Sequence, residues 1–439
     1  MGTFIPNTKE EQLQMLNDIG YKDWDDLFKD IPAAARIKCE LNIPAGKSEL
    51  ETAQIMEKMA NRNVVYDSIF RGAGAYNHYI PAAVNAVVSK EEFITAYTPY
   101  QAEISQGILQ SIFEYQTMIC ELTGMDVSNA SMYDGSTATA EAVLMAGNMG
   151  KKANKVLVSG TLDPKVLDVV KTYAFFHGIE IEMIAATDGI TDKNDLQERL
   201  GKGGVAGVVV QQPNYFGIIE DYSGFAELCH EQKALFIMNS IAADLALLKT
   251  PGEWGADIAV GDGQSLGIPM SWGGAYVGYM CCTEKLMRKM PGRIVGKTVD
   301  RNGQRAFVLT LQAREQHIRR QKATSNICSN ESLMALWVTI YMSLMGKQGL
   351  KEAAQMSYDG AHYLCEQLNK TGHFVLAYDR PFFNECCMRY DGDVDKLQKH
   401  LIDHGIFGGI KVANDTIMFA VTEKRSREEI DRLIDLCHE

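Results

Sequence analysis

The stretch Ile258-Ala-Val-Gly-Asp-Gly-Gln-Ser-Leu-Gly-Ile-Pro-Met-Ser-Trp-Gly-Gly274 gives the strongest indication of the fold. Its first three residues form a short apolar run that is typical of a buried strand, and the glycines after them predict a tight turn and a second loop. Gln264 stands in the turn, and no lysine occurs between Lys249 and Lys285. The segment therefore predicts a strand whose carboxyl end opens into a loop without a primary amine.

This layout resembles the strand and loop that carry the Schiff-base lysine in fold-type-I pyridoxal-phosphate (PLP) enzymes. In those enzymes the lysine stands a few residues before an Ile-Pro pair and a run of glycines. In this chain that place falls on Gln264, ahead of Ile268 and Pro269. Because an amide cannot form an imine, we expect no covalent PLP anchor here.

A second departure lies at the end of the preceding apolar run, residues 234–238. Fold-type-I enzymes usually place an aspartate after this strand, where its charge keeps the pyridine nitrogen protonated. This chain has Asn239, which is neutral and cannot do so. Asp244 comes five residues later, and we expect it to face elsewhere. Two departures at neighbouring strand ends indicate a PLP-type scaffold that does not run PLP chemistry alone.

Composition limits the classes of function. The net charge of −13 over 439 residues argues against binding to nucleic acid or to an anionic membrane surface. The longest uncharged apolar stretch, residues 332–346, is too short to span a bilayer. The N-terminus shows no basic region followed by an apolar run, so we expect no signal peptide. The ten cysteines include no C-x-x-C pair, which favours reduced thiols and a cytoplasmic location.

The order of patterns predicts an N-terminal arm over 1–97, a large domain over 98–330 and a small C-terminal domain over 331–439. In the large domain, short apolar runs separated by helix-compatible segments favour a mainly parallel sheet covered on both faces. In the small domain, two long helices precede strand-like residues. The expected large-domain strands are 156–158, 179–181, 208–210, 235–237, 258–260 and 275–277.

A glycine turn opens the helix that is expected from residue 135. The backbone N–H groups and hydroxyls of Gly135, Ser136 and Thr137 could hold a phosphate at the helix N-terminus, and a plain helix cap is the alternative. His400 and His404 have a helical spacing that can bind a metal. No third ligand accompanies them, so we interpret them as a polar helix face and expect no metal.

Two polar segments are candidates for a pocket or an interface. Residues 95–107 place Tyr97, Tyr100, Gln101 and Glu103 around a proline turn, and such polar aromatic loops often line pockets. The alternative is an aromatic contact between the arm and the large domain. The second segment is a basic run with small polar residues after it, which we interpret as structure or interface rather than catalysis; it holds Arg314, His317, Arg319, Ser325 and Asn326.

Several segments together resemble the glycine decarboxylase P-protein family, and within it the separate alpha (N-terminal) subunits. The likeness spans nearly the whole chain. It rests on Phe70-Arg-Gly-Ala-Gly-Ala-Tyr-Asn-His-Tyr-Ile-Pro81, Tyr97-Thr-Pro-Tyr-Gln-Ala-Glu-Ile-Ser-Gln-Gly107, Asp134-Gly-Ser-Thr-Ala138, Leu309-Thr-Leu-Gln-Ala-Arg-Glu-Gln-His-Ile-Arg-Arg320 and Lys322-Ala-Thr-Ser-Asn-Ile-Cys328.

The resemblance implies a fold-type-I PLP-transferase-like α/β chain with a mainly parallel seven-stranded sheet and a smaller C-terminal α/β domain. It implies a glycine dehydrogenase (decarboxylating) whose beta subunit carries the lysine and the PLP, in an alpha2-beta2 assembly. That enzyme decarboxylates glycine and passes the aminomethyl group to the lipoyl arm of the H-protein. The alpha chain would supply part of the pocket wall, including His78, and part of the docking surface, and alone it would be inactive.

Two other classes of function stay open. One is an independent PLP transferase that uses another lysine, which a Schiff-base absorption band from the lone chain would favour. The other is a non-catalytic scaffold or regulator built on a PLP-enzyme fold that no longer carries out PLP chemistry. Failure to form an active complex with any lysine-bearing homologue would favour the scaffold.

Overall fold

The computed structural model describes residues 6–37, 39, 41–150 and 153–438. The chain forms two units, the first ending at Val65 and the second beginning at Tyr66. The first unit contains α1 (Lys9–Asp18), α2 (Trp24–Leu27) and α3 (Glu49–Ala60). Ser48 and Glu51 form a capping box at the start of α3: the Ser48 side chain accepts a hydrogen bond from the Glu51 N–H, and the Glu51 side chain accepts one from the Ser48 N–H. Leu16 is the one buried side chain in these three helices.

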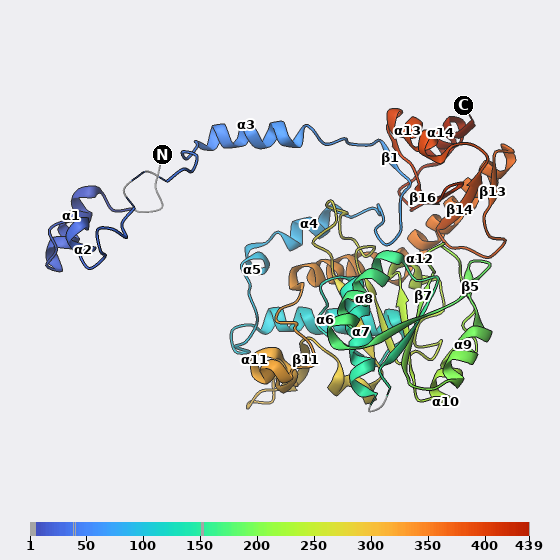
Figure 1. The fold of residues 1–439 in the computed structure, drawn as a ribbon, viewed down its shortest axis with the longest axis horizontal. Coiled ribbons are helices and arrows are strands. Elements are labelled where there is room, and N and C mark those ends of the chain that lie inside the picture. The colour runs from blue at the N-terminus through green and yellow to red at the C-terminus, as the bar shows by residue number, and fades with distance from the viewer. Residues whose placement is uncertain (1–5, 38, 40, 151–152, 439) are drawn as a thin grey trace. The chain divides into compact units, whose positions relative to one another are not determined.

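The second unit is built around a seven-stranded sheet, which confirms the predicted fold class (Figure 1). Neighbouring strands from β9 to β4 pair in parallel, while β10 runs antiparallel to both of its neighbours. In spatial order the strands are β2 (Val127–Ser128), β10 (Gly278–Cys282), β9 (Ile258–Asp262), β8 (Leu235–Ser240), β7 (Val205–Gln212), β3 (Lys155–Ser159) and β4 (Glu180–Ile184).

The prediction of a strand over 275–277 is wrong, because the strand begins at Gly278. Gly273 and Gly274 have φ values of +104° and +146°, so the chain turns there instead of extending. Val277 then closes the loop, since its carbonyl accepts a hydrogen bond from the Gly263 N–H at 2.7 Å. The result is a long loop that returns to the end of β9.

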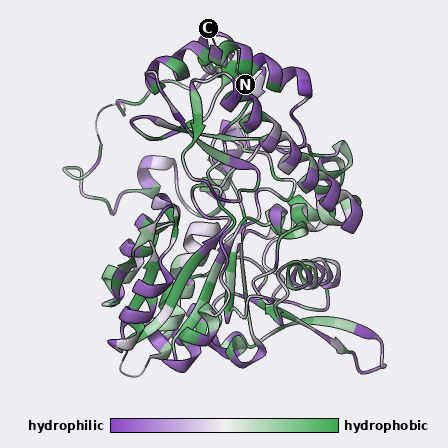
Figure 2. Cartoon of the chain, turned by 90° about the vertical axis from the view of Figure 1, so that its right-hand side faces the viewer, coloured by the Kyte–Doolittle hydropathy of each residue, from purple (hydrophilic) through white to green (hydrophobic). Residues whose placement is uncertain are grey.

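Helices cover both faces of the sheet, as the sequence predicts. Alternate residues of one strand enter different cores: Val209 and Ile237 belong to one cluster, and Val208 and Phe236 to another. The central strands are accordingly hydrophobic (Figure 2), and each fully buried aliphatic side chain contributes about 1.5–3 kcal/mol. The helices of this unit that pack around the sheet include α6 (Gln106–Thr123), α7 (Gly135–Met149), α8 (Pro164–His177), α9 (Lys193–Gly201), α10 (Phe225–Glu231) and α12 (Ser332–Lys370).

The C-terminal part forms a separate four-stranded antiparallel sheet. A further two-stranded parallel sheet pairs β1 (Ser68–Ile69) with β15 (Ile406–Phe407). The two long helices expected there are present as the two parts of α12, which the non-helical backbone of Gly346 (φ 60°, ψ 179°) separates. The sheet order is β13 (Phe374–Leu376), β14 (Glu385–Tyr390), β17 (Thr416–Ala420) and β16 (Ile410–Ala413), with α13 (Val394–Asp403) and α14 (Arg427–His438) beside it.

Several short elements complete the second unit. An antiparallel hairpin of β11 (Ile294–Val299) and β12 (Arg305–Thr310) is present that the sequence patterns did not predict. The domain limits at 97 and 330 stay predictions. Within the described part of the chain, no helix is both long and apolar enough to cross a membrane. The other elements are α4 (Ala82–Val88), α5 (Glu91–Ile94), β5 (Ala186–Thr187), β6 (Ile190–Thr191), α11 (Gln316–Arg319), η1 (Ala243–Ala246), η2 (Glu284–Lys289), η3 (Gln312–Arg314) and η4 (Arg320–Lys322).

Candidate functional site

The candidate site lies at the carboxyl ends of β8 and β9, where open parallel sheets commonly bind ligands. Asn239 is the second-to-last residue of β8, and Gln264 stands two residues after the end of β9. The N-terminus of α7 and the irregular loop 70–81 meet them there, as their hydrogen bonds show. Four segments that are distant in sequence therefore meet at these two strand ends.

The side chain of Gln264 is 1% exposed, and its amide is fully committed to hydrogen bonds. Its Oε1 accepts from the Tyr76 N–H at 2.8 Å, and its Nε2 donates to the Tyr76 carbonyl at 2.9 Å. The same Nε2 donates to the Ile268 carbonyl at 2.7 Å. Gln264 thus binds loop 70–81 as a neighbouring strand would, through one backbone donor and one backbone acceptor.

The same loop is held from the other side by Glu385, the first residue of β14. Its carboxylate accepts from the Ala73 N–H at 2.6 Å and from the Tyr76 hydroxyl at 2.9 Å. Burial raises the pKa of Glu385 to about 7, against the effect of these two hydrogen bonds. Burial also raises the pKa of Tyr76, as do the charges of Glu385 and Asp244. Asp244, which we expected to face elsewhere, therefore lies beside this cluster.

Asn239 bonds to α7 and not to an open cavity. Its Nδ2 donates to the Thr139 hydroxyl at 3.0 Å, and that hydroxyl donates to the Gly135 carbonyl at 2.8 Å. Asn239 is neutral, and its bond to Thr139 uses one of the two hydrogens on its Nδ2. It ties the end of β8 to the first turn of α7.

The N-terminus of α7 is capped by two carboxylates. The Gly135 N–H donates to Asp262 Oδ2 at 2.9 Å, and the Thr137 N–H donates to Asp134 Oδ1 at 2.8 Å, while Ser136 is half-buried between them. A side chain at position 135 would lie 2.7 Å from the Asp262 backbone nitrogen, so the contact requires glycine. Burial raises the pKa of Asp262 to about 7, against its hydrogen bonds from Gly135 and Gln264. The helix end is a self-capped structure.

His78, which the resemblance implies for the pocket wall, is buried against the C-terminal part of the chain. Its Nδ1 lies 2.6 Å from Glu423 Oε2, and the Tyr79 N–H donates to the other oxygen of Glu423 at 2.6 Å. Although burial opposes it, the hydrogen bond with His78 holds the pKa of Glu423 below its ordinary value. His78 thereby fastens loop 70–81 to the C-terminal part of the chain.

The tyrosine loop lies at the surface. Tyr97 is 83% exposed and Tyr100 is 55% exposed, and Gln101 and Glu103 are exposed as well. The Tyr100 hydroxyl accepts a hydrogen bond at 3.4 Å from Arg293, a residue that the sequence analysis missed. The loop therefore exposes aromatic and polar side chains to solvent, while the Tyr100 hydroxyl is bonded to Arg293.

The basic run divides between the surface and the interior. Arg314 donates to the Gly292 carbonyl at 2.9 Å, whereas His317, Arg319 and Asn326 are exposed. The Ser325 hydroxyl donates to Glu141 at 2.8 Å. Burial raises the pKa of Glu141 to about 7, against that hydrogen bond. These residues thus include both anchors of the 311–330 segment and exposed groups.

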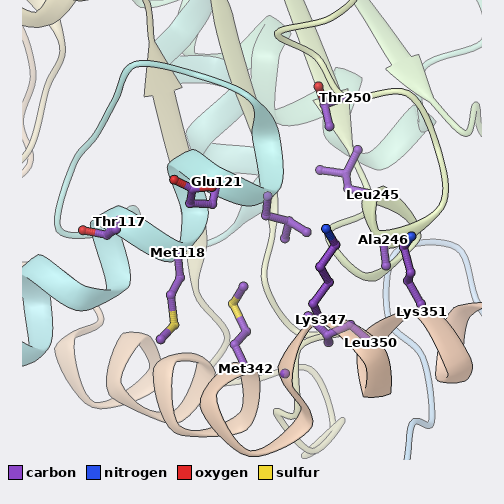
Figure 3. Close-up of a pocket in the computed structure, with 12 residues that line it drawn as sticks. Thr117, Met118, Glu121, Leu245, Ala246, Thr250, Met342, Lys347, Leu350 and Lys351 are labelled. Carbon is purple, nitrogen blue, oxygen red and sulfur yellow. The ribbon is translucent and has the colours of Figure 1, made fainter.

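A groove of about 430 Å³ lies elsewhere, between α6, η1 and the Gly346 break of α12 (Figure 3). Met118 and Met342 face each other across it, and Lys347 and Lys351 rise from α12 beside Ala246. None of its lining residues belongs to the Gln264 network. The groove and the strand-end site are separate features of the molecule.

Comparisons with known proteins place the sequence clearly. The family model described as glycine cleavage system P-protein matches residues 2–437. A protein of Desulforamulus reducens named "Probable glycine dehydrogenase (decarboxylating) subunit 1" is 50% identical over 438 residues, covering 98% of each chain. A protein of the same name from Listeria welshimeri is 48% identical over 439 residues, covering 98% of this chain and 97% of its own.

Solved structures agree with these relatives. A crystal structure of glycine decarboxylase (P-protein) of the glycine cleavage system, in inhibitor-bound form, superposes with a TM-score of 0.92 at 38% identity, covering 100% of this chain and 99% of that chain. An alanine–glyoxylate aminotransferase from Nostoc sp. superposes with a TM-score of 0.61 at 15% identity, covering 86% of this chain and 95% of that one, and this likeness concerns the fold.

Proposed function

Because this chain belongs to the glycine cleavage system P-protein family, we propose that it is the alpha subunit of a glycine dehydrogenase (decarboxylating). Its full-length relatives carry that activity in their names and are called subunit 1, which implies a second subunit. The alpha and beta subunits together decarboxylate glycine and transfer the aminomethyl group to the lipoyl arm of the H-protein. We place this assembly in the cytoplasm, as an alpha2-beta2 complex.

The residues at the strand-end site of this chain do not fit PLP. The amide of Gln264 cannot form an imine, and its hydrogen bonds to Tyr76 and Ile268 leave it committed. Asn239 carries no charge for a pyridine nitrogen. Two of the α7 N–H groups that could receive a phosphate, those of Gly135 and Thr137, already donate to Asp262 and Asp134, which would compete with it. We therefore assign the PLP to the beta subunit and route no chemical step through this site.

The first unit of the chain supports an obligate partner. A segment that buries one side chain over three helices has no core of its own, so it gains little stability from its own packing. A partner surface would cover such side chains and supply the missing burial. The exposed apolar residues of this unit include Leu13, Met15, Ile19, Trp24, Phe28, Ile31, Ile37, Leu41, Ile43, Leu50, Met56 and Met59.

The tyrosine loop is our candidate for this chain's share of the catalytic pocket. Glycine has little apolar surface, so its pocket needs placed hydrogen-bond donors. Tyr97, Tyr100 and Gln101 offer two hydroxyls and an amide, and Glu103 can orient them. We propose that they face the PLP of the beta subunit, where they bind and orient glycine and exclude water. We assign the docking surface to Arg314, His317, Arg319, Ser325 and Asn326.

The observation that carries this proposal is the combination of full-length family membership with a strand-end site that the chain has closed on itself. Mixing the chain with a lysine-bearing subunit 2 and measuring sedimentation tests the assembly. A single species that contains both chains, and that transfers an aminomethyl group from glycine to lipoylated H-protein, is the expected result. Two separate species, or a complex without transfer, would contradict the proposal and favour a scaffold or regulator.

A further inference from the structure

Arg293 is a buried cation at the point where three segments of the chain meet. It immediately precedes β11 and is 4% exposed. Its guanidinium donates to the Cys328 carbonyl at 2.7 Å and to Asn330 Oδ1 at 3.2 Å, which anchors residues 328–330. Its Nε lies 3.8 Å from Glu315 Oε2, an ion pair too long for a hydrogen bond. Together these groups fix the guanidinium in one orientation.

Tyr100 lies on the remaining side of this guanidinium. Its hydroxyl accepts from Arg293 Nη2 at 3.4 Å, and the guanidinium carbon lies 5.6 Å from the centre of its ring. The ring also meets the His317 ring edge-on, with 6.2 Å between centroids. His317 Nδ1 in turn lies 3.5 Å from Glu315. The hydroxyl and ring of the exposed tyrosine therefore contact groups from two other segments, while its N–H donates to the Thr98 carbonyl of its own loop at 2.9 Å.

We propose that Arg293 is a positioning residue, which sets the hydroxyl of Tyr100 for glycine and joins the tyrosine loop to the docking segment 314–330. This inference rests on the proposed function of the tyrosine loop. A planar guanidinium can hold three fixed partners at once because its donors form a rigid fork. A lysine at this position keeps the charge next to Glu315 but cannot bind Cys328, Asn330 and Tyr100 in one geometry.

The test compares Arg293→Lys with Arg301→Lys, a matched control in the exposed turn between β11 and β12. In the isolated full-length chain, amide hydrogen exchange over residues 97–105 should be at least about threefold faster in Arg293→Lys than in the control. Unchanged exchange over 97–105 would overturn the inference. If Arg293→Lys does not fold, Asn330→Ala, which removes one acceptor of the guanidinium, is measured in its place with the same expected direction.

The kinetic arm uses complexes reconstituted with subunit 2, after confirming that the wild-type complex is active. Arg293→Lys should assemble normally and lower kcat roughly tenfold. The double variant with Tyr100→Phe should lose no more than the worse single variant, because both changes remove the same interaction. Losses that multiply, or a weaker assembly with unchanged kcat per complex, would overturn the positioning role. An inactive wild-type complex would instead refute the proposed function, and the exchange experiment would still decide on Arg293.

Discussion

Gln264 and Tyr76 are joined through both polar atoms of the glutamine amide, which accepts from the Tyr76 N–H at 2.8 Å and donates to the Tyr76 carbonyl at 2.9 Å. Glu385 holds the same loop from the opposite side through Ala73 and the Tyr76 hydroxyl. The site is thus closed by the chain's own backbone, at the place where we position the lysine of a catalytic relative. We propose that the absence of an amine at Gln264 and the closure of the site are two aspects of one arrangement.

The purified chain should form no imine with PLP, because the turn after β9 has no amine and its amide is occupied. The measurement is borohydride reduction followed by peptide mapping, with a lysine-bearing subunit 2 as the positive control. A pyridoxyl-lysine anywhere between residues 98 and 330 would contradict this and favour an independent transferase.

Replacing Gln264 by lysine should not restore a cofactor site. The change leaves the Tyr76 N–H without its acceptor and buries an ammonium group, which together cost on the order of 2–4 kcal/mol. Gln264→Lys should therefore unfold at a lower temperature than Gln232→Lys, an exposed control after α10. Borohydride treatment with PLP should still label neither protein. Wild-type stability together with labelling at position 264 would show that the site is open.

The buried Glu385 should make stability depend on pH. Its folded pKa of about 7 lies above its ordinary value of 4.5. The stability that protonated Glu385 gives the folded chain is therefore fully present below the pKa of the unfolded state, and it is lost as the pH rises through about 7. The free energy of unfolding should fall over this window, by at most about 1.4 kcal/mol per pH unit for one group.

Chemical denaturation at several pH values checks this expectation. Glu385→Gln should reduce the slope of the unfolding free energy against pH between about pH 5 and 7, since glutamine does not titrate there, while Glu141 and Asp262 keep their share of the slope. Glu198→Gln, an exposed carboxyl on α9, should leave the slope unchanged. Equal slopes in the wild type and Glu385→Gln would mean that this carboxyl is ionised in the folded chain at neutral pH.

The tyrosine loop should matter for turnover and not for assembly. Tyr97→Phe and Tyr100→Phe each remove one hydroxyl from a largely exposed side chain, so both complexes should form normally. At least one variant should lower turnover roughly tenfold or more, the scale expected for one transition-state hydrogen bond. Full activity of both variants in intact complexes would reduce the loop to a structural contact, and the search for the pocket would move to Ser136 and Ser325.

Elements set by local chemistry could be predicted from the sequence. Gly124, with a φ of 69°, ends α6, as glycine commonly does at a helix C-terminus, and the predicted apolar runs at 208–210 and 235–237 lie in neighbouring parallel strands. The prediction of a strand at 275–277 was wrong, because these residues close a loop whose turn is formed by Gly273 and Gly274. The hairpin of β11 and β12 was missed although its strands hold apolar residues, because Gly296 and Lys297 interrupt the apolar run of β11.

The candidate site depends on contacts that no local pattern records. Glu385 lies 312 positions from Ala73, and although Ala73 belongs to the quoted segment 70–81, Glu385 stands in none of the segments that the sequence analysis singled out. Arg293 could have been noticed as a single arginine between a Pro-Gly turn and a β-branched run, but its partners Tyr100 and Cys328 are known only from the fold. The roles of Gln264, Asn239 and the tyrosine loop stay predictions.

The central claim is that this chain is required for glycine decarboxylation but does not hold the cofactor. The most direct measurement is glycine–bicarbonate exchange with lipoylated H-protein and PLP, run on the chain alone, on subunit 2 alone and on the mixture. We predict exchange in the mixture and none with the chain alone, with all reducible pyridoxyl label on subunit 2. Exchange by the chain alone at a rate comparable with that of the mixture would contradict the account.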